Sequence, residues 1–221
     1  MSFRPSFEQG SIIYTIQTYR TQEQTKIIVG GGFSQVNAIS RTSNAQLNYD
    51  GSVDISFNVT LTGESNITVH KIVVSNEQDT IYMGGLFTEV NRRIYQNFVR
   101  VTTTGQVDTT MFNPQFTELI YDFVIDRETS TIYVTGKDTR RSNVGETVTG
   151  PKVLLTRINL DGTPNNQWQL NPSTLFSDES ELTQRNFIYY DSNRQRILIS
   201  TKSSYYMIDE NGTLQYRRRY F

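Results

Sequence analysis

The feature that most limits how this chain can fold is an internal repeat. Residues 25–37, TKIIVGGGFSQVN, recur 54 positions later as residues 79–91, DTIYMGGLFTEVN. In both copies an apolar run enters a glycine pair and then a phenylalanine, a pattern typical of a largely buried β-strand. Self-similarity at a period near 50 residues predicts copies of one supersecondary unit, each of which needs neighbours to bury its faces.

The glycine pairs, Gly30-Gly31 and Gly84-Gly85, lie inside these predicted strands. Glycine in a strand usually marks a bulge or a place where another backbone approaches closely, because a Cβ would collide there. A phosphate-binding loop is the alternative. Neither GxGxxG nor GxxxxGK[ST] is present and no helical pattern follows, so we interpret the glycines as structural.

A second series of glycines, at positions 51, 105, 162 and 212, marks the predicted turns of four repeats. Three of the four turns are Asp-Gly or Asn-Gly, the pairs that supply positive φ angles in tight hairpins. A large ring follows each of the first three glycines, and we expect it to pack against the next repeat. The residues assigned to the repeat motif are Gly30, Gly31, Phe33, Gly51, Phe57, Gly84, Gly85, Phe87, Gly105, Phe112, Gly162, Trp168 and Gly212.

These signals predict an all-β fold, a β-propeller built from four repeats of four antiparallel strands. The propeller is either a four-bladed ring or an open arc completed by oligomerisation. We expect a single domain, 1–221, with repeats at about 10–58, 59–113, 114–170 and 171–221. Residues 1–9 supply an extra strand that pairs with the last blade or with a neighbour. The expected strands are 11–20, 26–33, 44–49 and 52–58; 68–75, 80–87, 97–102 and 106–113; 119–125, 131–136, 152–160 and 163–170; and 186–190, 196–201, 205–209 and 213 onward.

The segments IIVGGGFSQVN and QLNYDGSVDISFN resemble the delta-60 type β-propeller repeat. That family has a glycine-glycine-x-phenylalanine strand, an aspartate-glycine turn and an aspartate-x-x-phenylalanine strand. The resemblance covers residues 26–58 and 80–113, while the third copy keeps only Leu160-Asp161-Gly162 and an aromatic residue. It implies a propeller fold in bacterial surface proteins and some phage virion proteins, and it provides no common catalytic residues.

Composition excludes several function classes. The formal charge is −1, so no global basic field would attract nucleic acid. The chain has no cysteine, which excludes disulfides and thiolate catalysis. We expect neither a signal peptide nor a membrane span, because the first residues lack an apolar segment and no run approaches 18 apolar residues.

Two candidate sites have weak sequence support. Asp50, Ser52 and Asp54 have the alternate spacing of a calcium loop, but Ile55 and Leu61 stand where that loop needs glycine and glutamate. A turn with side-chain caps is therefore favoured. His70 is the only histidine, and its place in a predicted strand between Val69 and Lys71 fits a solvent-facing side chain as easily as a functional one. No catalytic residue, metal site or cofactor is predicted.

Arginines recur in the predicted connections between the second and third strands of the repeats. If these connections emerge on one face, guanidinium groups and a tyrosine gather there and can bind carboxylate, phosphate or glycan groups. The predicted binding residues are Arg41, Arg92, Arg93, Tyr95, Arg140 and Arg141. Ordinary loop solubility is the alternative reading of these charges.

The leading hypothesis is a non-enzymatic structural or binding propeller of a phage virion, a tail or tail-associated component that mediates assembly or host attachment. Its expected partners are other virion proteins or further copies of itself, and host-surface glycan is a further one. It would be made in the host cytoplasm and located in the virion. The alternative is a carbohydrate-binding propeller on the bacterial cell surface, and a glycoside hydrolase or lyase is third.

Overall fold

The computed structural model describes residues 3–64, 66–75, 79–141, 153, 155–165, 168 and 185–220. These residues form antiparallel β-sheets joined by turns, as the all-β prediction requires. Within them there is no helix long and apolar enough to cross a membrane. The chain divides into two compact units, Met1–Thr110 and Met111–Phe221, each of which is described by itself.

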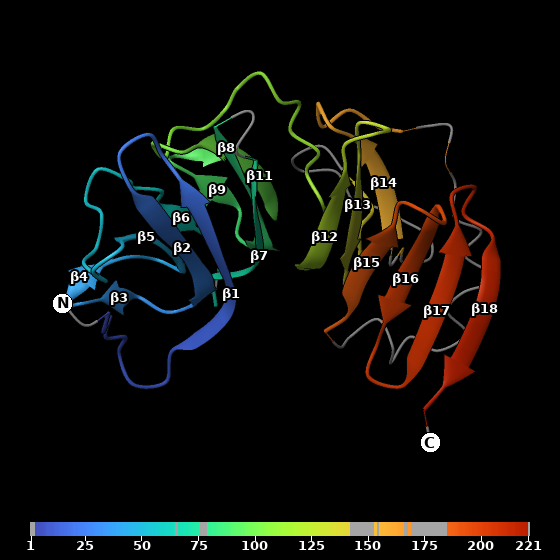
Figure 1. Cartoon of the computed structure of the whole chain (residues 1–221), viewed down its shortest axis with the longest axis horizontal. Helices are drawn as coiled ribbons and strands as arrows, with labels where there is room; N and C mark the ends of the chain where they lie inside the picture. The colour runs from blue at the N-terminus through green and yellow to red at the C-terminus, as the bar shows by residue number, and fades with distance from the viewer. Residues whose placement is uncertain are drawn as a thin grey trace. The chain divides into compact units, whose positions relative to one another are not determined.

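The first unit contains two large three-stranded sheets, in the orders β1-β2-β5 and β11-β8-β7 (Figure 1), a small three-stranded sheet, β10-β9-β6, and the two-stranded sheet β3-β4. The connections that follow β2 and β8 form small hairpins, and β6 joins the second of these. The strands of the first repeat are β1 (Ile12–Arg20), β2 (Thr25–Gly32), β3 (Gln35–Val36), β4 (Ile39–Ser40) and β5 (Asn44–Asn48). Those that follow are β6 (Leu61–Thr62), β7 (Thr68–Ser75), β8 (Thr80–Leu86), β9 (Glu89–Val90), β10 (Arg93–Ile94) and β11 (Phe98–Thr102).

The second unit contains a three-stranded sheet, β12-β13-β14, and a four-stranded sheet, β15-β16-β17-β18. Its strands are β12 (Ile120–Asp126), β13 (Thr131–Gly136), β14 (Leu155–Asn159), β15 (Phe187–Asp191), β16 (Arg196–Ser200), β17 (Ser204–Asp209) and β18 (Leu214–Arg219). A core of Ile and Tyr side chains with Trp168 lies between the two sheets.

The first three strands of every repeat form where the sequence predicts them, but the fourth does not in three repeats. Residues 52–58 and 106–113 contribute only single bridges, at Val53 and Val107, and 163–170 contributes one at Pro164, with several of its residues outside the described part. In the first two repeats, side chains explain the loss. Asp54 Oδ1 accepts the N–H of Ser56 at 2.9 Å, and this local bond replaces the ladder and turns the chain away.

The second glycine of each pair faces a bulge in the preceding strand. The β1–β2 register shifts between Ile13 and Thr15, opposite Gly31. A Cβ on Gly31 would lie 3.1 Å from the carbonyl carbon of Ile12 and closer still to its oxygen. Gly85 meets the backbone of β7 in the same way, so both glycines permit a close approach of two backbones.

The four turn glycines all have left-handed backbones, with φ angles from 81° to 87° at Gly51, Gly105, Gly162 and Gly212. Residues with a Cβ rarely adopt this region, which is why Asp-Gly and Asn-Gly recur at these corners. Phe33 and Phe87, which follow the glycine pairs, are buried.

Of the three rings expected after the turns, Phe57 and Trp168 are buried but Phe112 is not. Phe112 is 54% exposed, and Met111 takes the buried position with 5% exposure. In each of the first three repeats the buried residue stands six positions after the turn glycine, whereas Phe112 is seventh. A shift of one residue along an extended chain moves a side chain to the opposite face, which explains the error.

The described part of the N-terminal segment lies within the first unit, whereas the sequence predicts pairing with the last blade or a neighbour. Phe7 forms an antiparallel bridge with Val36. The N–H of Ser6 donates to Asn37 Oδ1 at 2.8 Å. One repeat later, β6 pairs with β9 in the same way. The N-terminal segment therefore gives the β3–β4 hairpin the strand pairing that the β9–β10 hairpin receives from β6.

Candidate binding site

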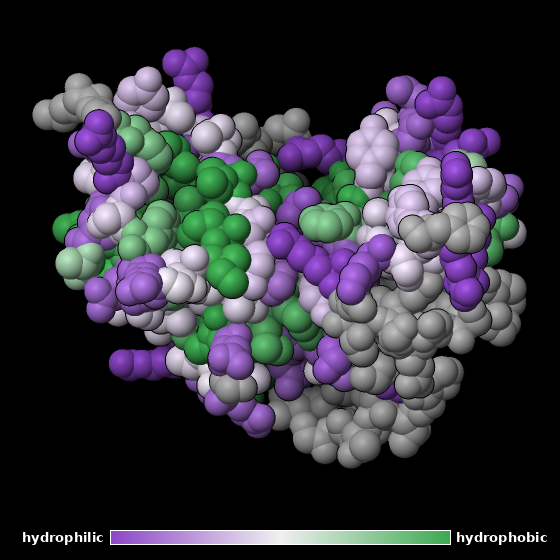
Figure 2. Space-filling model, turned by 90° about the horizontal axis from the view of Figure 1, so that it is seen from below, coloured by the Kyte–Doolittle hydropathy of each residue, from purple (hydrophilic) through white to green (hydrophobic). Residues whose placement is uncertain are grey.

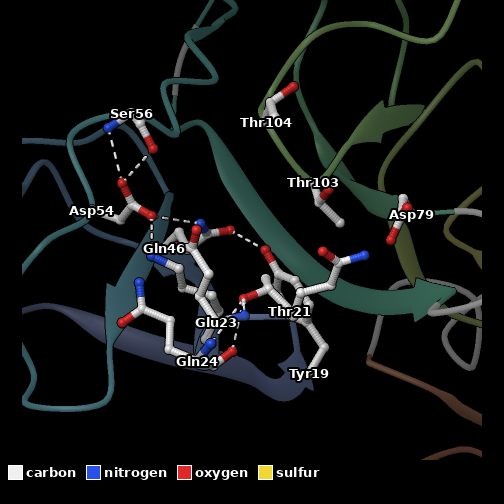
Figure 3. Close-up of a pocket in the computed structure, with 12 residues that line it drawn as sticks. Tyr19, Thr21, Glu23, Gln24, Gln46, Asp54, Ser56, Asp79, Thr103 and Thr104 are labelled. Carbon is white, nitrogen blue, oxygen red and sulfur yellow. Dashed lines mark hydrogen bonds and ion pairs between the residues drawn. The ribbon is translucent and has the colours of Figure 1, made fainter.

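A pocket of about 400 Å³ opens in the first unit, at the end where β1 turns into β2 (Figure 3). Its walls come from the first repeat, from the turn after β11 and from Asp79, the residue before β8. Its volume is in the range of small-ligand pockets, about 300–1,000 Å³. The lining residues are Tyr19, Thr21, Gln22, Glu23, Gln24, Lys26, Gln46, Asp54, Ser56, Asp79, Thr103 and Thr104.

The floor of the pocket is a buried polar network on the first sheet. Lys26 Nζ lies 2.6 Å from Asp54 Oδ2, and their side chains are only 11% and 9% exposed. Gln46 Nε2 donates to the same carboxylate oxygen at 2.9 Å. The Tyr19 hydroxyl donates to Gln46 Oε1, which completes a chain of four side chains from β1, β2, β5 and the segment after the turn (Figure 3).

This network fixes the protonation states of two of its members, Asp54 and Tyr19. Burial raises the pKa of the Asp54 carboxyl, but hydrogen bonds from Lys26, Ser56 and Gln46 outweigh burial and hold that pKa well below its usual range. Burial, together with the carboxylates of Asp54 and Asp79, raises the pKa of Tyr19 to about 12. Asp54 therefore remains ionised and Tyr19 remains neutral near pH 7, and neither is poised to exchange a proton.

The rim consists of exposed polar side chains on the tight turn between β1 and β2. Thr21 shapes this turn, since its Oγ1 accepts the N–H of Gln24 at 3.1 Å and donates to the Gln24 carbonyl at 2.9 Å. Gln22, Glu23 and Gln24 are exposed. Amide and carboxylate groups on a fixed turn can donate to and accept from several hydroxyl groups of one ligand.

The second repeat contains an ion pair equivalent to that of Lys26 and Asp54. Comparing the two repeats distinguishes the residues of the network that stabilise the fold from those that can bind a ligand. Arg100 Nε lies 2.9 Å from Asp108 Oδ2, where Asp108 is the counterpart of Asp54. The pairing of a cation with this aspartate therefore anchors the segment after the turn in both repeats. Tyr19 and Gln46 distinguish the pocket of the first repeat, because serine (Ser75) and arginine (Arg100) take their places one repeat later.

The sequence-predicted binding residues of the first unit lie outside the lining of this pocket. Arg92 and Arg93 are exposed on the β9–β10 hairpin, and Arg92 has a left-handed backbone with a φ of 65°. Arg41 is half-buried and donates to the carbonyls of Ser40 at 2.9 Å and Asp54 at 3.5 Å. Tyr95 packs partly buried against the core of the unit.

The two predicted arginines of the second unit are half-buried. Arg140 Nε lies 2.9 Å from Asp138 Oδ2, so its guanidinium already holds a carboxylate. Arg141 forms a bridge with Phe116, and burial lowers its pKa. Arg140 is therefore occupied by an internal partner.

His70 is buried, with 7% exposure, which excludes the solvent-facing reading of this position. It occupies the bulge of β7 and stacks on Tyr14, the bulge residue of β1, with ring centroids 4.1 Å apart. The bulge inserts one extra residue and so changes the face to which the side chain points.

The calcium-like spacing of residues 50–54 is explained by turns. Asp50 Oδ1 accepts the N–H of Ser52 at 2.9 Å, as Asp54 does from Ser56. Among the described residues there is no group of three or more acidic or histidine side chains that could hold a metal ion.

Comparison with known families agrees with this architecture. Residues 26–57 match the family model described as "Domain of unknown function (DUF5122) beta-propeller". The matched segment begins at Lys26 and ends at Phe57, and so includes β2, β5 and the turn at Gly51. A search of curated proteins found no match. The chain therefore contains a propeller-type repeat, and its activity must be argued from the pocket itself.

Proposed function

We propose that this protein is a non-enzymatic β-propeller that attaches a phage particle to its host by binding a surface glycan in the pocket of the first unit. The observation that supports this proposal best is the chemistry of the pocket. Its buried charges are paired with each other, and its exposed rim offers the amides, hydroxyls and carboxylates that suit a neutral, hydroxyl-rich ligand.

The same chemistry favours binding over catalysis. Glycoside hydrolysis uses two carboxyl groups on either side of the bond, one of them with a raised pKa. In this pocket the pKa of Asp54 is lowered by Lys26, Ser56 and Gln46. The remaining carboxylates of the pocket, Glu23 and Asp79, are exposed.

The proposal is tested by screening the purified chain on an array of bacterial capsular and lipopolysaccharide glycans. Glu23→Ala and Gln24→Ala should each weaken binding of the glycan that wild type retains, because both side chains are at the rim. Gln35→Ala is the matched control, since Gln35 is an exposed amide on the β3–β4 hairpin and lies outside the pocket lining. Equal loss in all three variants, or no loss in the rim variants, would contradict the proposal.

The proposed architecture is a succession of four blades, one for each large sheet, and the proposed location is the tail of a virion. Mass spectrometry of purified phage particles should detect the chain at a fixed copy number. If the chain is found instead on the bacterial cell surface, the glycan-binding proposal stands but the virion proposal fails.

A further inference from the structure

Neighbouring sheets within the first unit pack face to face through one recurring contact. A Cβ on Gly30 of β2 would lie 2.7 Å from Val69 Cγ1 and 3.0 Å from Ile72 Cδ1 on β7. Thr15 Oγ1, on β1, accepts the N–H of Ile72 at 3.3 Å. We call the face of a sheet that contacts the next repeat its leading face and the face that contacts the previous repeat its trailing face. Gly30 and Thr15 thus mark a leading face, and Ile72 marks a trailing face.

The second unit contains the same contact between its two sheets. Asp122 follows the bulge of β12, as Thr15 follows that of β1, and its Oδ2 accepts the N–H of Ile188 at 3.1 Å. Thr135 Oγ1 donates to Asn186 Oδ1 at 2.9 Å across the same interface. The leading face of β12-β13-β14 therefore meets the trailing face of the last sheet in the register seen in the first unit.

The trailing face of the first repeat is exposed where its counterparts are buried. Ile16 pairs with Val29, two residues before Gly31, as Ile72 pairs with Met83. Ile16 is 58% exposed, whereas Ile72 is 0% and Ile188 is 8% exposed. Figure 2 shows hydrophobic surface gathered on the first unit.

The leading face of the last repeat exposes several aromatic side chains. Tyr189, Leu198, Met207 and Tyr216 are register partners, and they form one row across all four strands of the sheet. Tyr189 is 64% exposed and Tyr216 45%, and Phe187 on the same face is 52% exposed. Aromatic side chains at this density on one sheet face are typical of a protein interface.

We propose that copies of this chain associate head to tail, with the trailing face of the first repeat on one copy packing against the leading face of the last repeat on a second copy. Inside both units a leading face packs against a trailing face. The exposed trailing face of the first repeat therefore suits the exposed leading face of the last repeat on another copy. A contact between two different surfaces is heterologous and builds rings or filaments. This inference rests on sheet register and exposure, and it is independent of the glycan pocket.

Engineered cysteines test the contact directly, because the native chain has none. Ser200 pairs with Phe187 as Gly30 pairs with Thr15, so Ser200 of one copy should lie against Ile16 of the other. Mild oxidation of a mixture of Ile16→Cys and Ser200→Cys should give a disulfide-linked dimer as the main product. A mixture of Ile94→Cys and Ser200→Cys is the control, since Ile94 is 48% exposed on the β9–β10 hairpin.

Two results would overturn the proposal. One is a yield of dimer in the Ile16 mixture no greater than in the Ile94 control. The other is an intrachain disulfide in a monomeric Ile16→Cys, Ser200→Cys double variant, which would mean that the chain closes on itself. Light scattering provides a second readout: Ile16→Lys should lose the oligomer of the wild type and Ile94→Lys should keep it, and both sites are exposed enough for the fold to tolerate lysine.

Discussion

Replacing Gly31 with alanine tests whether the glycine pair is required by the bulged β1–β2 pairing. The new Cβ would lie 3.1 Å from both the carbonyl carbon of Ile12 and the Cα of Ile13, and it would overlap the Ile12 oxygen. These are backbone atoms, so the clash can be relieved only by moving β1. Overpacking typically costs about 1–3 kcal/mol, and we expect the upper end, about 3 kcal/mol, because no side chain can move aside.

Gly32→Ala is the matched control, one residue away in the same strand. Its Cβ would meet Thr68 Cγ2 at 3.4 Å, an ordinary contact, and alanine is favoured over glycine in a strand by roughly 0.5–1 kcal/mol. Urea unfolding followed by circular dichroism should therefore show Gly31→Ala clearly less stable than wild type and Gly32→Ala equal or slightly more stable. Equal midpoints for the two variants would refute the reasoning.

Three further predictions concern the site and the core. Asp54→Asn should destabilise the fold by about 3 kcal/mol, measured by urea unfolding, because it leaves the buried Lys26 ammonium without its counter-charge; a change below about 1 kcal/mol would contradict the buried ion pair. Folding favours the neutral phenol of Tyr19, so the stability that this phenol contributes is complete below pH 10 and is lost as pH rises from about 10 to about 12. Across this window the melting temperature should fall less steeply for Tyr19→Phe than for wild type. Met111→Ala should cost about 2–5 kcal/mol and Phe112→Ala less than about 1 kcal/mol, and the reverse order in chemical denaturation would show that the wrong residue has been placed in the core.

Strands and turns could be predicted from sequence where one local rule decides the structure. The apolar runs before Gly31 and Gly85 lie in β2 and β8, and the four turn glycines have the backbone that the turns require. The prediction of the fourth strands was wrong because side chains redirect the backbone at Asp54 and Asp108. Each of these aspartates accepts the N–H of the residue two positions later. The recurring aspartate-x-serine or aspartate-x-threonine pattern was a visible signal of these turns.

The candidate site was harder to predict because it assembles segments that lie far apart in the sequence. Its rim includes Gln24 and its opposite wall includes Thr103. No periodic pattern links these positions, and only the packing of two repeats brings them to one pocket. The arginine prediction followed the connections between strands, but it overlooked local partners such as Asp138, which stands two residues before Arg140 and binds it.

The most direct test of the proposed function measures binding and cleavage in the same sample. The host polysaccharide identified on the array would be titrated into the purified chain by calorimetry, and its chain length would be measured before and after incubation. The account predicts saturable binding that Gln24→Ala weakens, with polysaccharide length unchanged. Shortening of the polysaccharide by wild type, or undiminished binding by Gln24→Ala, would contradict it.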